Sequence, residues 1–165
     1  MADYERSTTA TRLDGLPDVL RAAVQDQVDR RLLTVPADSP AFVSHNRRLK
    51  RSGFLRRATG SGDPDPEHWV AVVIGPKDVV VAVHGEQRGT STMTLRLEDA
   101  DVADLAAQYG DLAPKVDDHG VSIVGFPVSV EGGATGRGSF FVGLGAPDGE
   151  AASAALREAV RAAKA

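Results

Sequence analysis

The strongest hydrophobic pattern in the chain lies between His68 and Leu97, where three strand-like segments are separated by two short turns. Valine dominates the first two segments, and the restricted χ1 angle of a β-branched side chain suits a pleated sheet. Turn-forming residues occupy positions 75–78, and two glycines lie in the second turn at 84–89. The pattern predicts an antiparallel β-meander, which is a structural frame and carries no reaction by itself.

A helical pattern precedes the meander. Apolar residues recur in steps of three and four from Leu16 to Leu32, which places them along one stripe of a helix. Pro17 suits the first turn of such a helix, and Pro36 should lie beyond its end. We therefore expect an amphipathic N-terminal helix within residues 13–35.

The second half of the chain predicts strands and one helix. Strands are expected at Val121–Val130 and Ser139–Leu144, joined by a glycine-rich loop, whereas residues 98–118 suggest a short helix. A C-terminal helix is expected from Gly149, with Asp148 at its N-cap position. Its apolar side should consist of Ala152, Ala155, Leu156, Ala159, Val160 and Ala163.

Length and composition indicate one soluble domain. Of the 165 residues, 42% are hydrophobic and 25% are charged, which is ordinary for a globular protein. We expect a flexible tail at residues 1–12, and a sheet domain at residues 36–165 that follows the helix. The absence of cysteine excludes disulfides, thiolate catalysis and cysteine-containing metal sites.

The sequence also bears on location. The first residues lack the apolar segment of a secretory signal. The longest apolar runs fall far short of the roughly 20 residues that a membrane-spanning helix requires. We therefore expect a cytoplasmic protein.

Charge is distributed unevenly, although the net charge is only −4. Residues 47–57 hold basic side chains and no acid, whereas residues 98–118 are strongly acidic. The basic stretch is the candidate site for an anionic ligand or a partner, and its members are Arg47, Arg48, Lys50, Arg51, Arg56 and Arg57.

Several interpretations of this basic stretch stay open. It can bind an anionic lipid surface, at roughly 1 kcal/mol per basic residue near the membrane, or steer an acidic partner. It can also be a solvated strand edge, or it can pair with the acidic stretch within one chain or between two copies. The negative net charge makes nucleic acid an unlikely partner.

Local residues resemble the pleckstrin-homology-like (PH-like) family. Residues 50–57, KRSGFLRR, are similar to the basic opening strand of that family, and residues 68–73, HWVAVV, are similar to its tryptophan-bearing second strand. The order of strands followed by one C-terminal helix, over about residues 40–165, also resembles bacterial PH-like proteins. The resemblance implies a scaffold that binds a protein or another ligand, without naming that ligand.

Residues for chemistry are scarce. No two of the histidines have the i,i+4 spacing of a helical metal site, so we expect no metal. The glycine-rich segments 133–139 and 143–149 lack the features of phosphate-binding loops, and no nucleophile motif is present, so we expect no cofactor and no catalysis. Trp69, Phe140 and Phe141 are expected to be core aromatics.

Together these patterns predict an α+β protein. We expect a PH-like antiparallel barrel or sandwich of six to seven strands, capped by the C-terminal helix and preceded by the extra N-terminal helix. The favoured function is a non-catalytic interaction module that binds a protein partner or forms a homo-oligomer. The alternatives are binding of an anionic membrane surface through residues 47–57, and binding of a small molecule in a cavity beneath the terminal helix.

Overall fold

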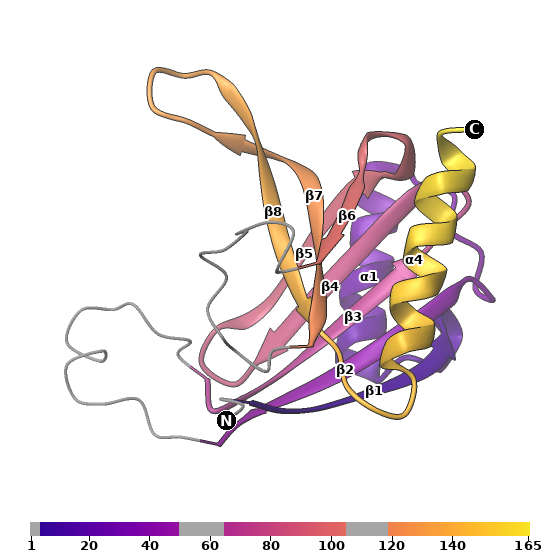
Figure 1. Ribbon diagram of the computed structural model, residues 1–165, viewed down its shortest axis with the longest axis vertical. Coiled ribbons are helices and arrows are strands. Elements are labelled where there is room, and N and C mark those ends of the chain that lie inside the picture. The colour runs from indigo at the N-terminus through magenta and orange to yellow at the C-terminus, as the bar shows by residue number, and fades with distance from the viewer. Residues whose placement is uncertain (1–3, 50–64, 105–118) are drawn as a thin grey trace.

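The computed structural model of the chain describes residues 4–49, 65–104 and 119–165, and it has an α+β architecture with two antiparallel sheets (Figure 1). The strands are β1 (Tyr4–Arg12), β2 (Pro40–Arg48), β3 (Glu67–Ile74), β4 (Asp78–Gly85), β5 (Gly89–Arg96), β6 (Asp101–Asp104), β7 (Gly120–Ser129) and β8 (Thr135–Gly143). The helices are α1 (Asp18–Arg31) and α4 (Gly149–Ala163), with single 3-10 turns η1 (Leu13–Gly15) and η2 (Leu97–Asp99). In these described ranges, no helix is long and apolar enough to cross a membrane.

The first sheet has the order β1-β2-β3-β4-β5, and every neighbouring pair is antiparallel. Its last three strands are the predicted meander, which is confirmed. Side chains alternate between the two faces of a strand, and here both faces are buried: Val72 and Val81 face one core, whereas Val73 and Val80 face the other. Two buried faces explain why the valine runs are continuous instead of alternating with polar residues.

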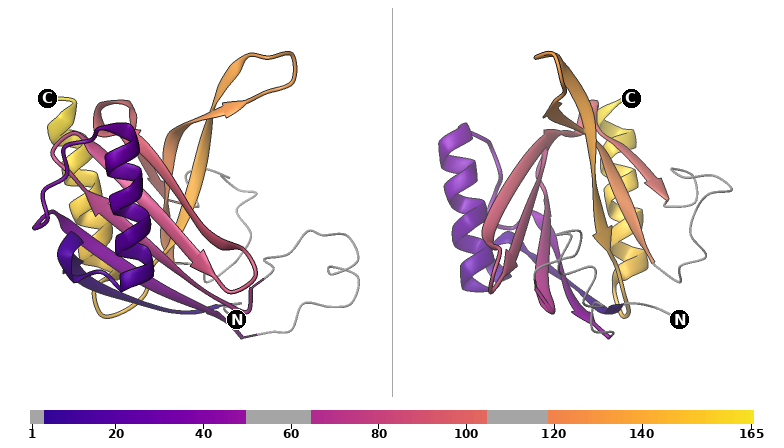
Figure 2. Two further views of the ribbon diagram at one scale, coloured as in Figure 1. Left: turned by 180° about the vertical axis from the view of Figure 1, so that it is seen from behind. Right: turned by 90° about the vertical axis from the view of Figure 1, so that its left-hand side faces the viewer.

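Helix α1 covers one face of this sheet (Figure 2). Its buried stripe includes Leu20, Val24 and Val28, and the polar Gln27 reaches β5, where it hydrogen-bonds the hydroxyl of Thr94 at 2.9 Å. Leu32, which the periodicity placed on the same stripe, instead ends the helix in the left-handed conformation and is 90% exposed.

The opposite face packs against α4 and the second sheet, whose order is β6-β7-β8. The predicted apolar side of α4 is confirmed, because Ala152, Leu156 and Val160 are buried in this core. The layers are therefore α1, the five-stranded sheet, and then α4 beside the three-stranded sheet (Figure 2).

Of the expected barrel or sandwich, the barrel is wrong, and the described residues form eight strands instead of six or seven. Each sheet keeps its own ladder, and the five-stranded sheet remains open between β1 and β5. The physical reason is its two-sided burial: a barrel encloses one core, whereas this sheet separates a core under α1 from a second core under α4.

The expected flexible tail is also corrected, because most of residues 1–12 belongs to β1, which pairs with β2 along its length. β1 is an edge strand whose only fully buried side chain is that of Thr8, so its sequence lacks the apolar alternation that predicts a strand. The helix α1 consequently lies between the first two strands and is not an extra element ahead of the sheet domain. In the acidic stretch, Asp101–Asp104 forms β6 where a helix was expected.

Candidate interaction surface

The described members of the basic stretch lie at the end of β2, on opposite faces of the sheet. Arg47 shares a face with α1, whereas Arg48 faces the side of α4, because successive side chains of a strand alternate. Arg47 lies between two carboxylates, 3.9 Å from Glu5 and 3.9 Å from Glu67. These two arginines therefore do not form one cationic patch. Lys50, Arg51, Arg56 and Arg57 lie outside the described residues.

The described part of the acidic stretch pairs with other basic residues. Glu98 binds Arg96 at 2.9 Å, and Asp104 binds Arg157 at 2.6 Å. Asp101 binds both Lys164 at 2.5 Å and Arg137 at 3.1 Å. Hydrogen bonds from these two cations, first Lys164 and then Arg137, lower the pKa of Asp101 below its ordinary value. Asp101 and Asp104 thus link β6 to α4 and its C-cap residue Lys164, whereas Glu98 pairs with a residue close to it in the sequence.

A row of aromatic and polar side chains crosses the five-stranded sheet beside Arg47, and we call it the Trp69 row. Register places its members opposite one another on the α1 face: Ser7, His45, Trp69, His84 and Thr90. The indole of Trp69 stacks on the imidazole of His45, with ring centroids 4.8 Å apart and an interplanar angle of 12°. On its other side lies His84, at 6.4 Å between centroids.

The Trp69 row lies where the cover provided by α1 ends. Ala71 and Ala82, in the next row of the same face, are fully buried. By contrast Trp69 and both histidines are only partly buried, and Thr90 is exposed. A groove of about 550 Å³ between α1 and β5 opens at Thr90, and a hollow of about 230 Å³ opens at Arg47 and Trp69.

The two histidines of the row differ in their hydrogen bonds. His84 shares a hydrogen bond of 2.7 Å between Nδ1 and the hydroxyl of Thr90, which fixes the orientation of its ring. The Nε2 atom of His45 has no hydrogen-bond partner and lies 3.8 Å from a Glu67 oxygen. Tryptophan and arginine are the residue types that most often dominate the binding energy of protein interfaces. The row therefore presents an aromatic surface, formed by the stacked Trp69 and His45 rings, beside Arg47.

Trp69 was predicted to be a core aromatic, and it packs against the core under α1 while remaining partly exposed. Its row with His45 and His84 was not predicted. The row was hard to recognise because a large aromatic residue at a strand position usually packs inward. The one available sign was the charged Glu67, which lies two residues before Trp69 and therefore on the same face of β3.

A buried carboxylate lies close to this surface. Asp65 is inaccessible to solvent and accepts hydrogen bonds from the backbone N–H groups of Gln87 and Arg88, at 2.6 and 3.2 Å, and from Arg88 Nε at 3.1 Å. Burial alone raises the pKa of Asp65, but these hydrogen bonds and the charge of Arg88 outweigh it and lower the pKa below its ordinary value. The carboxylate holds the turn between β4 and β5 and is a structural group.

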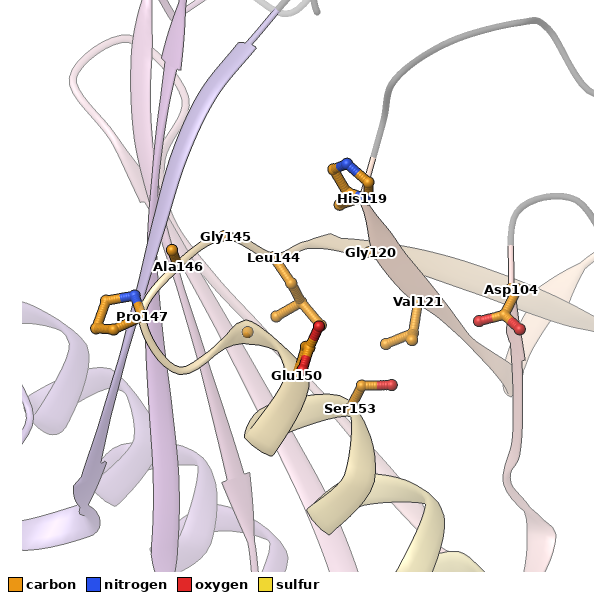
Figure 3. Close-up of a pocket in the computed structure, with 11 residues that line it drawn as sticks. Asp104, His119, Gly120, Val121, Leu144, Gly145, Ala146, Pro147, Glu150 and Ser153 are labelled. Carbon is orange, nitrogen blue, oxygen red and sulfur yellow. The ribbon is translucent and has the colours of Figure 1, made fainter.

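A pocket of about 410 Å³ opens at the first turn of α4 (Figure 3). Val121 and Leu144 contribute apolar surface to it, and polar groups come from α4 and from the strands facing it. Those polar residues are Asp104, His119, Glu150 and Ser153. The hydroxyl of Ser153 accepts a hydrogen bond from Arg157 at 3.4 Å. Its described partner is therefore a guanidinium and not a histidine that could act as a general base.

Deeper between α4 and the sheets, the packing leaves a void of only about 10 Å³. Within the three described ranges, no group of three histidine, aspartate or glutamate side chains is arranged to hold a metal ion.

Comparison of the chain with protein-family models, with curated proteins and with solved structures gives no match. The residues themselves therefore carry the functional argument.

Proposed function

We propose that the protein is a non-catalytic interaction module whose Trp69 row binds a protein partner. The resemblance to bacterial PH-like proteins implies a function of the same kind. One observation carries the proposal: the single tryptophan of the chain is stacked on a histidine at the end of a sheet face that α1 does not cover, beside an arginine.

The composition of the row favours a protein over an anionic membrane as the partner. A membrane surface requires several cations on one face, whereas of the two described members of the basic stretch Arg47 is placed between Glu5 and Glu67 and Arg48 belongs to the other face. A protein interface uses a central aromatic anchor with a mixed polar rim, which is the arrangement around Trp69.

Site-specific photo-crosslinking in cells tests the proposal. A photoreactive amino acid replaces Thr90, at the exposed end of the row, and a matched variant carries it at Ala154, on the exposed side of α4. We expect a discrete crosslinked partner from the Thr90 variant and none from the Ala154 variant.

A second set of variants separates binding from folding. Combining the Thr90 probe with His45→Ala and His84→Ala should abolish the crosslink while leaving the thermal unfolding midpoint within a few degrees, because both side chains are partly exposed. A crosslink that survives these changes, or equal crosslinking from Ala154, contradicts the proposal.

The pocket at α4 supports a second candidate function, the binding of a small molecule. Its volume of about 410 Å³ is in the range of ligand sites, and its apolar surface carries a few polar groups. A screen of amine-bearing aromatic fragments by amide NMR should shift Gly120 and Gly149, which line the pocket. The Ser153→Phe variant should remove these shifts, and the absence of shifts from every fragment contradicts this candidate.

A further inference from the structure

The hairpin of β7 and β8 extends away from the body of the protein (Figures 1 and 2). β6 pairs with β7 from Val121 to Val124, and beyond a bulge at Gly125 no described strand flanks the β7–β8 hairpin. We call residues 126–138 the arm. Apart from Phe126 at its base, its residues are exposed or half-buried, and Val128 and Val130 are 40% and 44% exposed.

The arm has one flat apolar face. Phe126, Val128 and Val130 alternate along one side of β7, in line with the buried Ile123 across the bulge. Gly136 and Gly138 lie opposite them, and a Cβ at Gly138 would come within 2.5 Å of a Val128 methyl group. The valines thus lie across the glycines, and the apolar face of the sheet extends beyond the core that it covers.

The hydrogen-bond pattern identifies the backbone groups on each edge of the arm. The N–H of Val130 donates to the carbonyl of Ala134 at 3.0 Å, which makes this a hydrogen-bonded pair. Because hydrogen-bonded and non-hydrogen-bonded pairs alternate in an antiparallel ladder, Ser129–Thr135 and Pro127–Arg137 are non-hydrogen-bonded pairs. Their backbone groups therefore point outward, away from the hairpin.

The two outer edges differ. On the β7 edge Pro127 has no N–H to offer, so this edge resists pairing with another strand. On the β8 edge Thr135 and Arg137 both offer an N–H and a carbonyl, and no described residue pairs with these groups. The β8 edge of the arm is therefore able to accept a further strand.

Two other described sheet edges, those of β1 and β6, have backbone groups that are hydrogen-bonded. At β1, Thr8 exchanges backbone hydrogen bonds with Ala146 and Asp148, at 3.2 and 3.0 Å, and the Asp148 carboxylate accepts the N–H of Ala10 at 2.7 Å. At β6, Arg157 Nη1 donates to the carbonyl of Val102 at 3.2 Å. Unlike these two edges, the β8 edge of the arm has outward backbone groups at Thr135 and Arg137 that no described residue pairs with.

We propose that the β8 edge of the arm pairs antiparallel with the same edge of a second copy of this chain. A twofold axis at Gly136 places Thr135 opposite Arg137 of the other copy, so that the outward N–H and carbonyl groups of both residues are satisfied. Gly136 then meets its own counterpart at a non-hydrogen-bonded position, where Cα atoms approach closely and a glycine fits. The apolar faces of the two arms become one surface.

Charge favours a second copy over a charged peptide as the occupant. Between residues 126 and 138 only Glu131 and Arg137 are charged, and the Arg137 guanidinium already binds Asp101 at 3.1 Å. Two identical arms therefore do not repel one another, and this register keeps the two Arg137 side chains from lying directly opposite each other. The paired area is small for an interface, so the dimer should be weak and concentration-dependent.

Sedimentation velocity over a wide concentration range tests the proposal on the full chain. The wild type should shift from monomer to dimer as concentration rises, with little change on adding salt. Thr135→Pro removes an outward N–H without breaking a β7–β8 hydrogen bond, and it should abolish the dimer. Ser129→Pro makes the matched change on the β7 edge and should leave the dimer intact.

Spin labelling gives a second test, because it reports whether two arms lie close together. The chain has no native cysteine, so a single introduced cysteine can be labelled specifically. A nitroxide at Thr135→Cys should show dipolar broadening at high concentration, and one at Ala154→Cys on α4 should show none. A wild type that stays monomeric at every concentration, or a dimer that survives Thr135→Pro, overturns the inference. A dimer that dissociates with salt also overturns it, because pairing of the acidic and basic stretches would then explain association.

This contact is independent of the Trp69 row. Thr135→Pro should leave crosslinking from Thr90 unchanged, and the histidine substitutions in the row should leave sedimentation unchanged. Failure of either proposal is therefore distinguishable from failure of the other.

Discussion

The five-stranded sheet is buried on both faces, whereas the three-stranded sheet buries one face at its base and then leaves the body as the arm (Figure 2). The first sheet is held by its side chains, with valines directed into two cores. The arm is held mainly by its own backbone ladder, with glycines opposite its valines. Stability should therefore concentrate in the first sheet, and the arm is available for contacts outside the chain.

The largest expected effect comes from truncating the two cores of the five-stranded sheet. Leu20→Ala in α1 and Leu156→Ala in α4 each remove a side chain that is at most 3% exposed. Each should lower the free energy of unfolding by about 2–5 kcal/mol, measured by urea denaturation. A loss below about 1 kcal/mol for either variant would mean that its core does not stabilise the sheet.

The buried carboxylate below the β4–β5 turn should give the next largest effect. Asp65→Asn removes the buried charge that pairs with Arg88 at 3.1 Å and should lower the thermal midpoint at neutral pH by roughly 5 °C or more. Because the pKa of Asp65 is lowered on folding, its stabilisation is present above the ordinary value of 3.8 and is lost as pH falls through the folded pKa.

The pH dependence provides the control for this variant. Wild-type stability should fall on acidification below about pH 5, and the difference from Asp65→Asn should shrink toward zero at the acid end. Asp101, whose pKa is also lowered, contributes with the same sign, so Asp101→Asn is the matched comparison. A wild-type–Asp65→Asn difference that is constant across the acid range would contradict this assignment.

The bulge at the base of the arm should be less costly to disturb. Gly125 has φ of +132°, and an added Cβ would lie 2.7 Å from the carbonyl oxygen of Asp99. Gly125→Ala should therefore destabilise the protein by about 1–3 kcal/mol. Hydrogen exchange should accelerate in β7 and β8 but not in β3, and equal acceleration in β3 would contradict a local effect.

Removal of the β6 edge protection should have a smaller effect. Arg157→Ala frees the carbonyl of Val102 and the partly exposed Asp104. We expect a loss of about 1 kcal/mol, since both contacts are partly solvated. Arg157→Lys retains the charge, but an ammonium group cannot bond the Val102 carbonyl and Asp104 with the geometry of the guanidinium, so it should recover only part of the loss.

The smallest effect is expected in the arm itself. Val128→Ser should change the free energy of unfolding by less than about 0.5 kcal/mol, because the side chain is 40% exposed. The same change should weaken dimerisation by removing part of the shared apolar face. A large loss of stability from Val128→Ser would mean that the arm belongs to the core, and the contrast between the two sheets would then disappear.

The sequence predicted those parts of the fold in which local pattern and environment agree. The meander and the apolar side of α4 follow from periodicity. The β7–β8 hairpin was predicted with its second strand starting at Ser139, whereas β8 begins at Thr135, because the glycines of the expected loop pair with β7. β1 could not be recognised, because it is a polar edge strand that pairs with β2 on one side and bonds the distant residues Ala146 and Asp148 on the other. Asp148 occupies the predicted N-cap position of α4, but its carboxylate accepts the N–H of Ala10 in β1 instead of capping the helix.

The candidate surfaces were harder to predict than the elements. Adjacent basic residues suggested one patch, but the pleat of β2 separates Arg47 from Arg48. The Trp69 row is assembled from five strands, so no short stretch of sequence contains it. The open β8 edge depends on the register of the hairpin, which composition alone does not specify.

The bonds that close the β1 edge also constrain how the chain is made. Thr8 leaves the ribosome long before its backbone partners Ala146 and Asp148 are synthesised. β1 therefore remains an open edge while all the residues between them are translated. Contacts of such long sequence separation slow folding and prolong the exposure of unpaired strands to other nascent chains. The same polar sequence that made β1 hard to predict should limit its association with other chains during this period.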